Sequence, residues 1–202
     1  DLSAKRQWSS VPRGAEISTN REYQKVLSEH SNWSSRVSDK AQKSIRGYTG
    51  SDFVEINNDL RTTAPASEFV SNINDITSAL EDSFLSNDMV VFRVMPLDVV
   101  KTMQGTDAVY EDKGFVSTSV SKKVLGANVQ GALEVSVDED LELVEIRLPK
   151  GAKAAPIGKF STSAGELEVL IQRGSRFRIV KSFGNDSIVL ELAEQPKLSK
   201  LT

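Results

Sequence analysis

Three short, widely separated segments of the sequence carry residues that could act together on a charged ligand. Arg93 lies inside the apolar run 90–94, a Ser-Thr-Ser triplet occupies 117–119, and a Glu-Leu-Glu motif occupies 166–168. A guanidinium in an apolar strand is costly to bury unless it meets an anion, and its fork of donors matches a phosphate or a carboxylate. Arg93 is therefore a candidate anion-binding residue, although an arginine that faces solvent from an edge strand is the simpler interpretation when it is taken alone.

The two acidic residues of the 166–168 motif are candidates for electrostatic or acid–base chemistry. Residues two apart on a strand point to the same side, so Glu166 and Glu168 are expected to face one cleft. Two carboxylates on one side repel each other, which usually requires a functional reason. A solvated strand end would also account for the pair, and local capping at a strand end would account for the hydroxyls of Ser117, Thr118 and Ser119.

Taken in order, the three segments resemble the R–S–E class of ADP-ribosyltransferases, whose arginine-modifying members carry Glu-x-Glu. The stretch 151–158, followed by an aromatic residue at Phe160 and then by the acidic motif, is similar to the segment with which those enzymes present a turn and the catalytic acid. The stretch 48–57 is similar to a motif at the start of a helix in clostridial binary actin-modifying toxins and related insecticidal toxins. The resemblance extends over residues 45–183.

The resemblance implies that the substrate is NAD and assigns a role to each residue of the set. Cleavage of the bond between nicotinamide and ribose leaves positive charge on the ribose, and Glu168 would be the carboxylate that stabilises it. Ser117 would orient Glu168, and Arg93 would bind the NAD phosphates. Glu166 would bind the acceptor arginine and help to deprotonate it. The related asparagine-modifying class has Gln at this position, so Glu166 favours arginine as the acceptor.

Further contacts follow from the same resemblance. Phe160 is expected to take part in substrate recognition. Arg147 could contact a phosphate, and the interpretation as an ordinary arginine on a strand accounts for it equally well. The further cofactor-binding candidates are Thr118, Ser119, Tyr48, Asn57 and Arg147. The sequence departs from the relatives at Phe53, where they often have tyrosine, and at Val94, where the binary toxins have a second arginine.

The elements that must position these residues form an α+β pattern. The helical spacing of apolar residues predicts helices at 19–30, 38–47, 51–60 and 67–80. Ser38 is expected to cap the second helix, and Gly47 is expected to end it. Runs of β-branched and aromatic residues predict strands at 89–94, 115–119, 132–137, 141–148, 167–171, 176–183 and 187–192. The last two strands are expected to form a hairpin around a turn at 184–186.

These elements predict one domain over residues 1–202, with a helical lobe at 1–86 and a mostly antiparallel β core at 87–195. The resemblance implies that this core consists of two small sheets.

Composition excludes several other classes of protein. The 202 residues contain no cysteine and one histidine, so disulfides and thiolate metal sites are absent and a metal cofactor is not expected. The net charge of −3 offers no broad positive field for nucleic acid, and no apolar run is long enough to span a membrane. His30, Trp8 and Trp33 are interpreted as packing residues.

The biological setting follows from the resemblance alone. It implies a bacterial toxin or effector that is secreted or injected, acts in the target-cell cytoplasm and has actin as the first candidate target. Because the chain begins with Asp1 and shows no signal peptide, it is expected to be a processed chain or a domain of a longer protein. Two alternatives stay open, namely an NAD glycohydrolase that uses water as acceptor and a catalytically silent module that binds a partner.

Overall fold

The computed structural model describes residues 20–62, 68–122, 141–162, 164–182, 184 and 188–202. Within these residues, helical segments come first, followed by a sheet of eight strands, and the predicted α+β class is confirmed. The expected strand at 132–137, Trp8 and most of the expected hairpin turn lie outside the described residues. The helices that precede the sheet are α1 (Asn20–Glu29), α2 (Ser31–Ser34), α3 (Asp39–Gly47), η1 (Tyr48–Asp52), α4 (Phe53–Arg61) and α5 (Val70–Glu81).

The connection from α3 to α4 differs from the sequence prediction in one respect. Ser38 caps α3 as predicted, because its hydroxyl accepts from the Ala41 amide at 3.2 Å. The helix α3 ends at Gly47 as predicted, but without a left-handed glycine cap, because Gly47 has a helical φ of −60° and the chain continues through the π-helical turn η1 into α4. A Cβ at Gly47 would lie 2.8 Å from an Asp52 carboxylate oxygen, so the glycine allows the wide turn to pack. Single π turns often occur at functional sites.

The eight strands form one continuous sheet in the order β2-β7-β8-β4-β1-β3-β6-β5, where two small sheets were expected. All neighbours are antiparallel except β4 and β8. One residue pair, Phe92↔Ser119, joins β1 to β3 and so unites the two halves. The strands are β1 (Met89–Pro96), β2 (Val109–Asp112), β3 (Val116–Ser119), β4 (Leu141–Leu148), β5 (Ala154–Pro156), β6 (Glu168–Ile171), β7 (Ser175–Lys181) and β8 (Ile188–Glu194).

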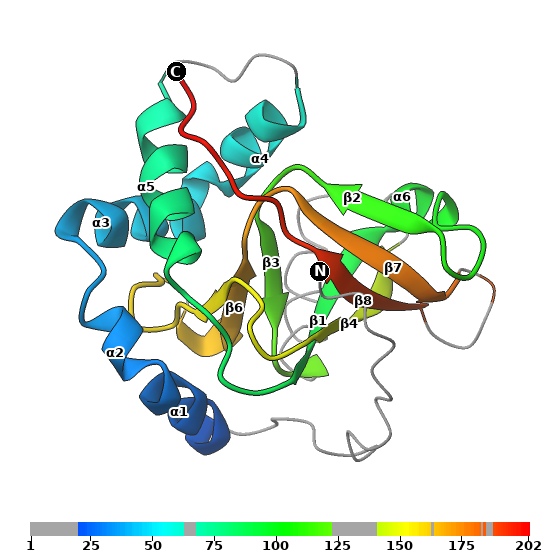
Figure 1. Cartoon of the computed structure of the whole chain (residues 1–202), viewed down its shortest axis with the longest axis horizontal. Helices are drawn as coiled ribbons and strands as arrows, with labels where there is room; N and C mark the ends of the chain where they lie inside the picture. Colours follow the sequence, from blue (N-terminus) through cyan, green and yellow to red (C-terminus); the bar gives the residue numbers. More distant parts are fainter. Residues whose placement is uncertain (1–19, 63–67, 123–140, 163, 183, 185–187) are drawn as a thin grey trace.

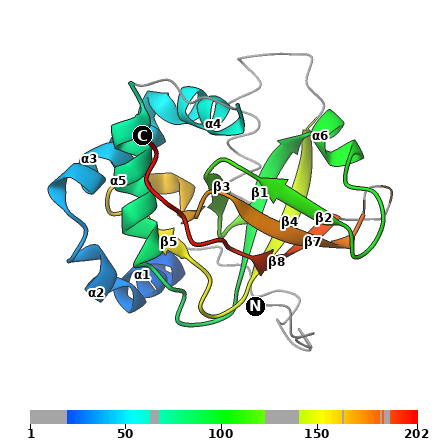
Figure 2. The same ribbon diagram turned by 45° about the horizontal axis from the view of Figure 1, so that its top comes forward.

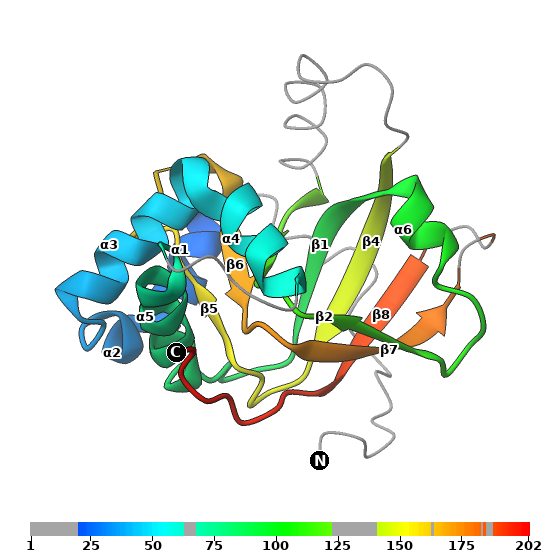
Figure 3. The ribbon, with the colours of Figure 1, turned by 90° about the horizontal axis from the view of Figure 1, so that it is seen from above.

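The helices α1 to α5 gather at the β5–β6 end of the sheet, whereas the short helix α6 (Leu97–Lys101) lies at the opposite end (Figures 1 and 3). Strand β6 lies between two apolar cores. Its Val169 and Ile171 belong to the core of the sheet, which also takes in Tyr23 of α1, whereas Leu170 belongs to the core formed with α3, α4 and α5. Because side chains alternate along a strand, Glu168 points to the same side as Leu170, toward these helices.

The C-terminal segment closes the fold by returning from β8 to α5 (Figure 2). Asn74 on α5 exchanges two hydrogen bonds with the backbone of Leu201, at 2.8 and 3.0 Å. Arg173 donates to the Ser199 carbonyl at 3.1 Å. No helix in the described part of the chain combines the length and apolar character needed to cross a membrane.

Candidate active site

A pocket of about 370 Å³ lies between the η1–α4 helical segment and the strands β1 and β3. This volume falls in the range of small-molecule sites. The pocket is lined by Tyr48, Thr49, Gly50, Phe53, Asn57, Arg93, Val94, Ser117, Thr118, Ser119, Glu166 and Glu168. Eight of the ten site residues predicted from the sequence therefore come together in one pocket.

The pocket lies where β1 and β3 part. These strands pair only at Phe92↔Ser119. The residues next to that pair, Arg93 and Val94 on β1 and Thr118 on β3, line the pocket. The incomplete pairing of two central strands thus leaves room for a ligand. Arg93 stands on an interior strand, which excludes the alternative of an edge-strand arginine.

Glu168 ends a chain of hydrogen bonds that begins on α4. Ser117 Oγ donates to Glu168 Oε1 at 2.8 Å, and the Tyr48 hydroxyl lies 3.3 Å from Ser117 Oγ. Asn57 Nδ2 donates to the Tyr48 hydroxyl at 2.9 Å, and Asn57 Oδ1 accepts from the Phe115 amide at 2.9 Å. The Tyr48 hydroxyl also lies 3.4 Å from the Phe115 carbonyl, to which it can donate. Every member of the chain is thereby fixed relative to the Glu168 carboxylate.

The other two hydroxyls of the triplet hold the backbone of the acidic segment. Thr118 Oγ1 donates to the Val169 carbonyl at 2.6 Å, and Ser119 Oγ donates to the Glu166 carbonyl at 2.7 Å. The three hydroxyls of 117–119 therefore hold the segment that carries the two acids at Glu166, Glu168 and Val169. Strand-end capping alone does not describe this arrangement.

The two acids share the pocket by a different geometry from the one expected. Glu166 belongs to a short 3₁₀ turn, η2 (Ala164–Glu166), and the strand begins only at Glu168. Leu167 between them has a φ of +51°, in the left-handed region that a leucine rarely adopts. The sharp turn at Leu167, and not strand alternation, brings both carboxylates to the pocket. Backbone strain of this kind is concentrated at functional sites.

The two carboxylates differ in environment. Glu168 is 5% exposed, whereas Glu166 is exposed at the pocket. Burial raises the pKa of Glu168 from 4.5 to about 7, the Ser117 hydrogen bond opposes this shift, and the charge of Glu166 adds to it. Burial also raises the pKa of Tyr48, so its hydroxyl stays protonated as a donor.

Tyr23 supports Glu168 from behind, and sequence reasoning assigned it no role in the site. Its hydroxyl donates to the Glu168 carbonyl at 2.5 Å and accepts from the Gly158 amide at 3.1 Å. Gly158 must stay small there, because a Cβ would lie 2.8 Å from the Tyr23 ring. The helical periodicity indicated that Tyr23 is buried, but no signal in the sequence indicated which strand it contacts.

Arg93 is partly buried and faces a carboxylate that the sequence analysis also missed. Its Nη1 lies 3.6 Å from Asp112 Oδ2 at the end of β2. The same nitrogen is buried and has no hydrogen-bond partner within the described residues. The Asp-Lys-Gly turn at 112–114 was visible in the sequence, but its contact with β1 was not.

Two predicted residues lie outside the pocket. Arg147 on β4 pairs with Glu145 at 2.9 Å and stands opposite Val90, away from the residues that line the pocket, and its contact with the cofactor stays a prediction. Phe160 is 6% exposed and packs edge-on against Trp33 with ring centroids 5.9 Å apart. This contact anchors the chain at Phe160 to the helical core, and the part of Phe160 in substrate recognition stays a prediction.

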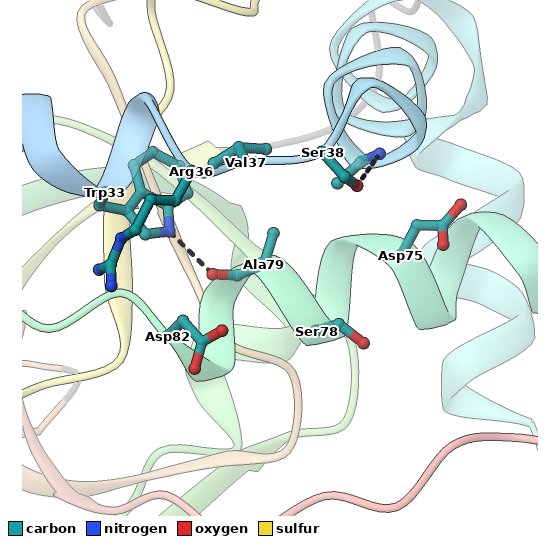
Figure 4. Close-up of a pocket in the computed structure, with 9 residues that line it drawn as sticks. Trp33, Arg36, Val37, Ser38, Asp75, Ser78, Ala79 and Asp82 are labelled. Atoms are coloured by element: carbon teal, nitrogen blue, oxygen red, sulfur yellow. Dashed lines mark hydrogen bonds between the residues drawn. The ribbon is translucent and has the colours of Figure 1, made fainter.

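A second hollow, of about 250 Å³, lies between α2–α3 and α5 (Figure 4). Trp33 donates to the Ala79 carbonyl at 2.8 Å across it, and Asp75 and Asp82 lie along its α5 side. None of the site residues predicted from the sequence lines this hollow. His30 is buried with Nδ1 3.0 Å from the Val26 carbonyl, in keeping with a packing role. Among the described residues, no group of three or more His, Cys, Asp or Glu side chains could hold a metal ion.

The fold is shared with ADP-ribosyltransferase toxins of known structure. An ADP-ribosyltransferase from Clostridium botulinum matches with a TM-score of 0.69 at 17% identity, over 88% of this chain and 96% of that chain. A relative from S. aureus, solved with NAD, matches with a TM-score of 0.66 at 19% identity, over 88% and 96%. The Vis toxin from Vibrio splendidus, solved in complex with agmatine, matches with a TM-score of 0.61 at 18% identity, over 87% and 86%. At these identities the likeness establishes the fold.

The fold and the pocket together define a protein of the ADP-ribosyltransferase class. The sequence model of the ADP-ribosyltransferase exoenzyme family matches residues 27–196, and the chain belongs to this family. The donor of ADP-ribose is NAD. No curated protein sequence matches the chain.

Proposed function

We propose that residues 1–202 act as one domain that transfers ADP-ribose from NAD to an arginine side chain of another protein. The observation that carries this proposal is the shared pocket of Glu166 and Glu168. One carboxylate is buried and held by Ser117, and the other is exposed where an incoming side chain can reach it. Two acids with such different surroundings suit two different tasks.

Glu168 stabilises the positive charge that develops on the ribose as the bond to nicotinamide breaks. Its ionised carboxylate is held by the Ser117 hydroxyl at 2.8 Å in a site largely closed to water. A fixed charge in such a site acts more strongly than one in water, and it does not have to reorganise during the reaction. Tyr48 and Asn57 contribute by fixing Ser117.

Arg93 binds the phosphates of NAD by charge-assisted hydrogen bonds. Its guanidinium lines the same pocket as Glu168, so that the diphosphate and the ribose of one dinucleotide can be held together. Thr118 and Ser119 line the same pocket and are further candidates for contacts with NAD. Phe53, which is 47% exposed, provides an apolar wall on the α4 side.

Glu166 receives the acceptor. A guanidinium is protonated near neutral pH and is a poor nucleophile, so a carboxylate that binds it and accepts its proton assists attack. A guanidinium nitrogen forms the new bond to the ribose C1′, the C1′–nicotinamide bond breaks, neutral nicotinamide leaves with the bonding electrons, and the proton passes to Glu166. The complex of the Vis toxin with agmatine, a guanidinium compound, supports a guanidinium acceptor.

The chain is further proposed to act as a toxin or effector that is secreted or injected and works in the target-cell cytoplasm. The relatives of known structure that share its fold are named as toxins. Actin is the first target to test, because the stretch 48–57 is similar to that of binary actin-modifying toxins. This stretch contributes Tyr48, Phe53 and Asn57 to the pocket.

The test measures nicotinamide release and label transfer from NAD, with agmatine, with actin and with no acceptor. Glu168→Ala is expected to lose about 10²–10⁴ in both rates. Glu166→Gln is expected to keep release without acceptor and to lose transfer. Glu68→Gln, at an exposed glutamate outside the pocket, is the matched control and is expected to behave as the wild type.

Each alternative predicts a different result in the same assay. A glycohydrolase would release nicotinamide at one rate with or without acceptor and would label nothing. A silent binding module would release none. Equal loss of release and transfer in Glu166→Gln would show that Glu166 does not serve the acceptor.

A further inference from the structure

Asp112 lies between two arginines that come from different parts of the chain. Its carboxylate, 2% exposed, accepts from Arg61 of α4 at 3.1 Å to each oxygen, with a further contact from Arg61 Nε at 3.3 Å. Arg93 Nη1 on β1 lies 3.6 Å from Asp112 Oδ2. A buried carboxylate between two guanidiniums links the helical side of the pocket to the strand that carries Arg93.

The Asp112 carboxylate is fixed independently of Arg93. The Gly114 amide donates to Oδ1 at 2.9 Å, and the Tyr110 hydroxyl donates to Oδ2 at 3.5 Å. The turn is packed closely against α4, because a Cβ at Gly114 would lie 2.7 Å from Asn57 Oδ1 and 3.3 Å from Arg61 Nη2. With donors on both oxygens, Asp112 presents a stationary negative charge to Arg93.

Arg93 in turn depends on that charge for its orientation. Its Nη1 is buried without a hydrogen-bond partner among the described residues, and Asp112 is the carboxylate that it approaches. A planar guanidinium that is held at one nitrogen can direct its remaining N–H donors toward a second anion. The two arginines and one aspartate leave one net positive charge beside a pocket for a dinucleotide that carries two phosphates.

We propose that Asp112 is a positioning residue, which holds one edge of the Arg93 guanidinium so that the other edge meets the NAD phosphates. The inference rests on the proposed role of Arg93 as the phosphate-binding residue. Asp112 itself does not touch the reacting atoms. Its effect is therefore expected on the binding of ligands that contain the diphosphate, and not on nicotinamide.

The experiment measures dissociation constants of NAD, ADP-ribose and nicotinamide by calorimetry, together with nicotinamide release at saturating NAD. Asp112→Asn keeps the shape of the side chain and removes its charge. It is expected to weaken NAD and ADP-ribose binding about tenfold, which lies within the range of coupling energies between side chains of one salt-bridge network. Nicotinamide binding and the rate at saturation are expected to stay within about twofold. Asp112→Asn is expected to have no further effect in an Arg93→Ala background.

The outcomes separate this inference from the proposed function. Should Arg93→Ala leave ADP-ribose binding intact, the role of Arg93 itself is wrong. Should Arg93→Ala weaken binding while Asp112→Asn does not, only the positioning role is overturned. Equal weakening of ADP-ribose and nicotinamide binding by Asp112→Asn would show a merely structural residue.

A further variant carries the test if Asp112→Asn does not fold. Arg93→Lys keeps the positive charge but replaces the two edges of the planar guanidinium by one compact ammonium, so it is expected to bind ADP-ribose as poorly as Arg93→Ala does. Wild-type affinity in Arg93→Lys would refute the proposal.

Discussion

Replacement of Glu168 by glutamine should stabilise the protein while it removes activity. Burial raises the pKa of Glu168 from 4.5 to about 7, so the folded state favours the neutral acid. The stability that this carboxyl supplies is fully present below about pH 4.5 and is lost as pH rises through about 7, where the folded protein must hold a buried charge. Glutamine has nearly the same shape, accepts from Ser117 in the same way and never ionises.

The size of the effect follows from the pKa. A change from 4.5 to about 7, at about 1.4 kcal/mol for each tenfold change in acid dissociation, gives about 3 kcal/mol. Glu168→Gln is therefore expected to be more stable than the wild type by about 3 kcal/mol near pH 8. The advantage is expected to fall to almost nothing near pH 4, because the wild-type acid is then neutral in both states.

The assay is urea unfolding at about pH 4, 6 and 8, followed by tryptophan fluorescence, to which Trp33, buried in the helical core, contributes. Glu166→Gln is the matched control, since it makes the same chemical change at an exposed neighbour, and it is expected to change stability by about 0.5 kcal/mol or less. Equal stability of Glu168→Gln and wild type at every pH would refute the buried-charge reasoning, as would a destabilisation independent of pH.

The remaining predictions concern rate and packing. The rate of nicotinamide release at saturating NAD, measured at a series of pH values, is expected to rise with pH through about 7 as Glu168 ionises. Glu166→Gln removes a neighbouring negative charge and is expected to move the midpoint of this pH–rate curve to lower pH. Gly158→Ala is expected to cost about 1–3 kcal/mol in thermal unfolding, because its Cβ would strike the hydrogen-bonded Tyr23 ring; an unchanged melting temperature would show that the ring can move. Asn57→Ala is expected to cost about 1–3 kcal/mol in urea unfolding and to slow release, since it leaves a buried amide unpaired and frees the Tyr48 hydroxyl.

Residue type and order were enough to predict that Arg93, Ser117 and Glu168 share one site, but not the geometry that unites them. Strand alternation was expected to align Glu166 with Glu168, whereas a positive φ at Leu167 does so. A leucine carries no sequence signal for that conformation. Gly47 similarly indicated a helix end, although its small size serves a close contact inside a continuous helical path.

The contacts that sequence reasoning missed join residues far apart in the chain. Asp112 meets Arg61, 51 positions earlier, and Tyr23 meets Glu168 at a separation of 145. Local periodicity predicts that such side chains are buried but cannot name their partners. The strands β2 and β5 were missed for simpler reasons, because β2 ends in two acidic residues, Glu111 and Asp112, and the three residues of β5 are too few to show a pattern.

The Tyr23 hydroxyl shows that support for the pocket comes from residues that precede the segment matched by the family model. The family sequence model starts at residue 27, so α1 contributes this phenol from outside the matched segment. A fragment trimmed to that segment would retain every residue of the pocket and yet leave the Glu168 carbonyl and the Gly158 amide without their shared partner. The matched segment thus contains the residues of the pocket, whereas a side chain that supports Glu168 lies on α1, N-terminal to that segment.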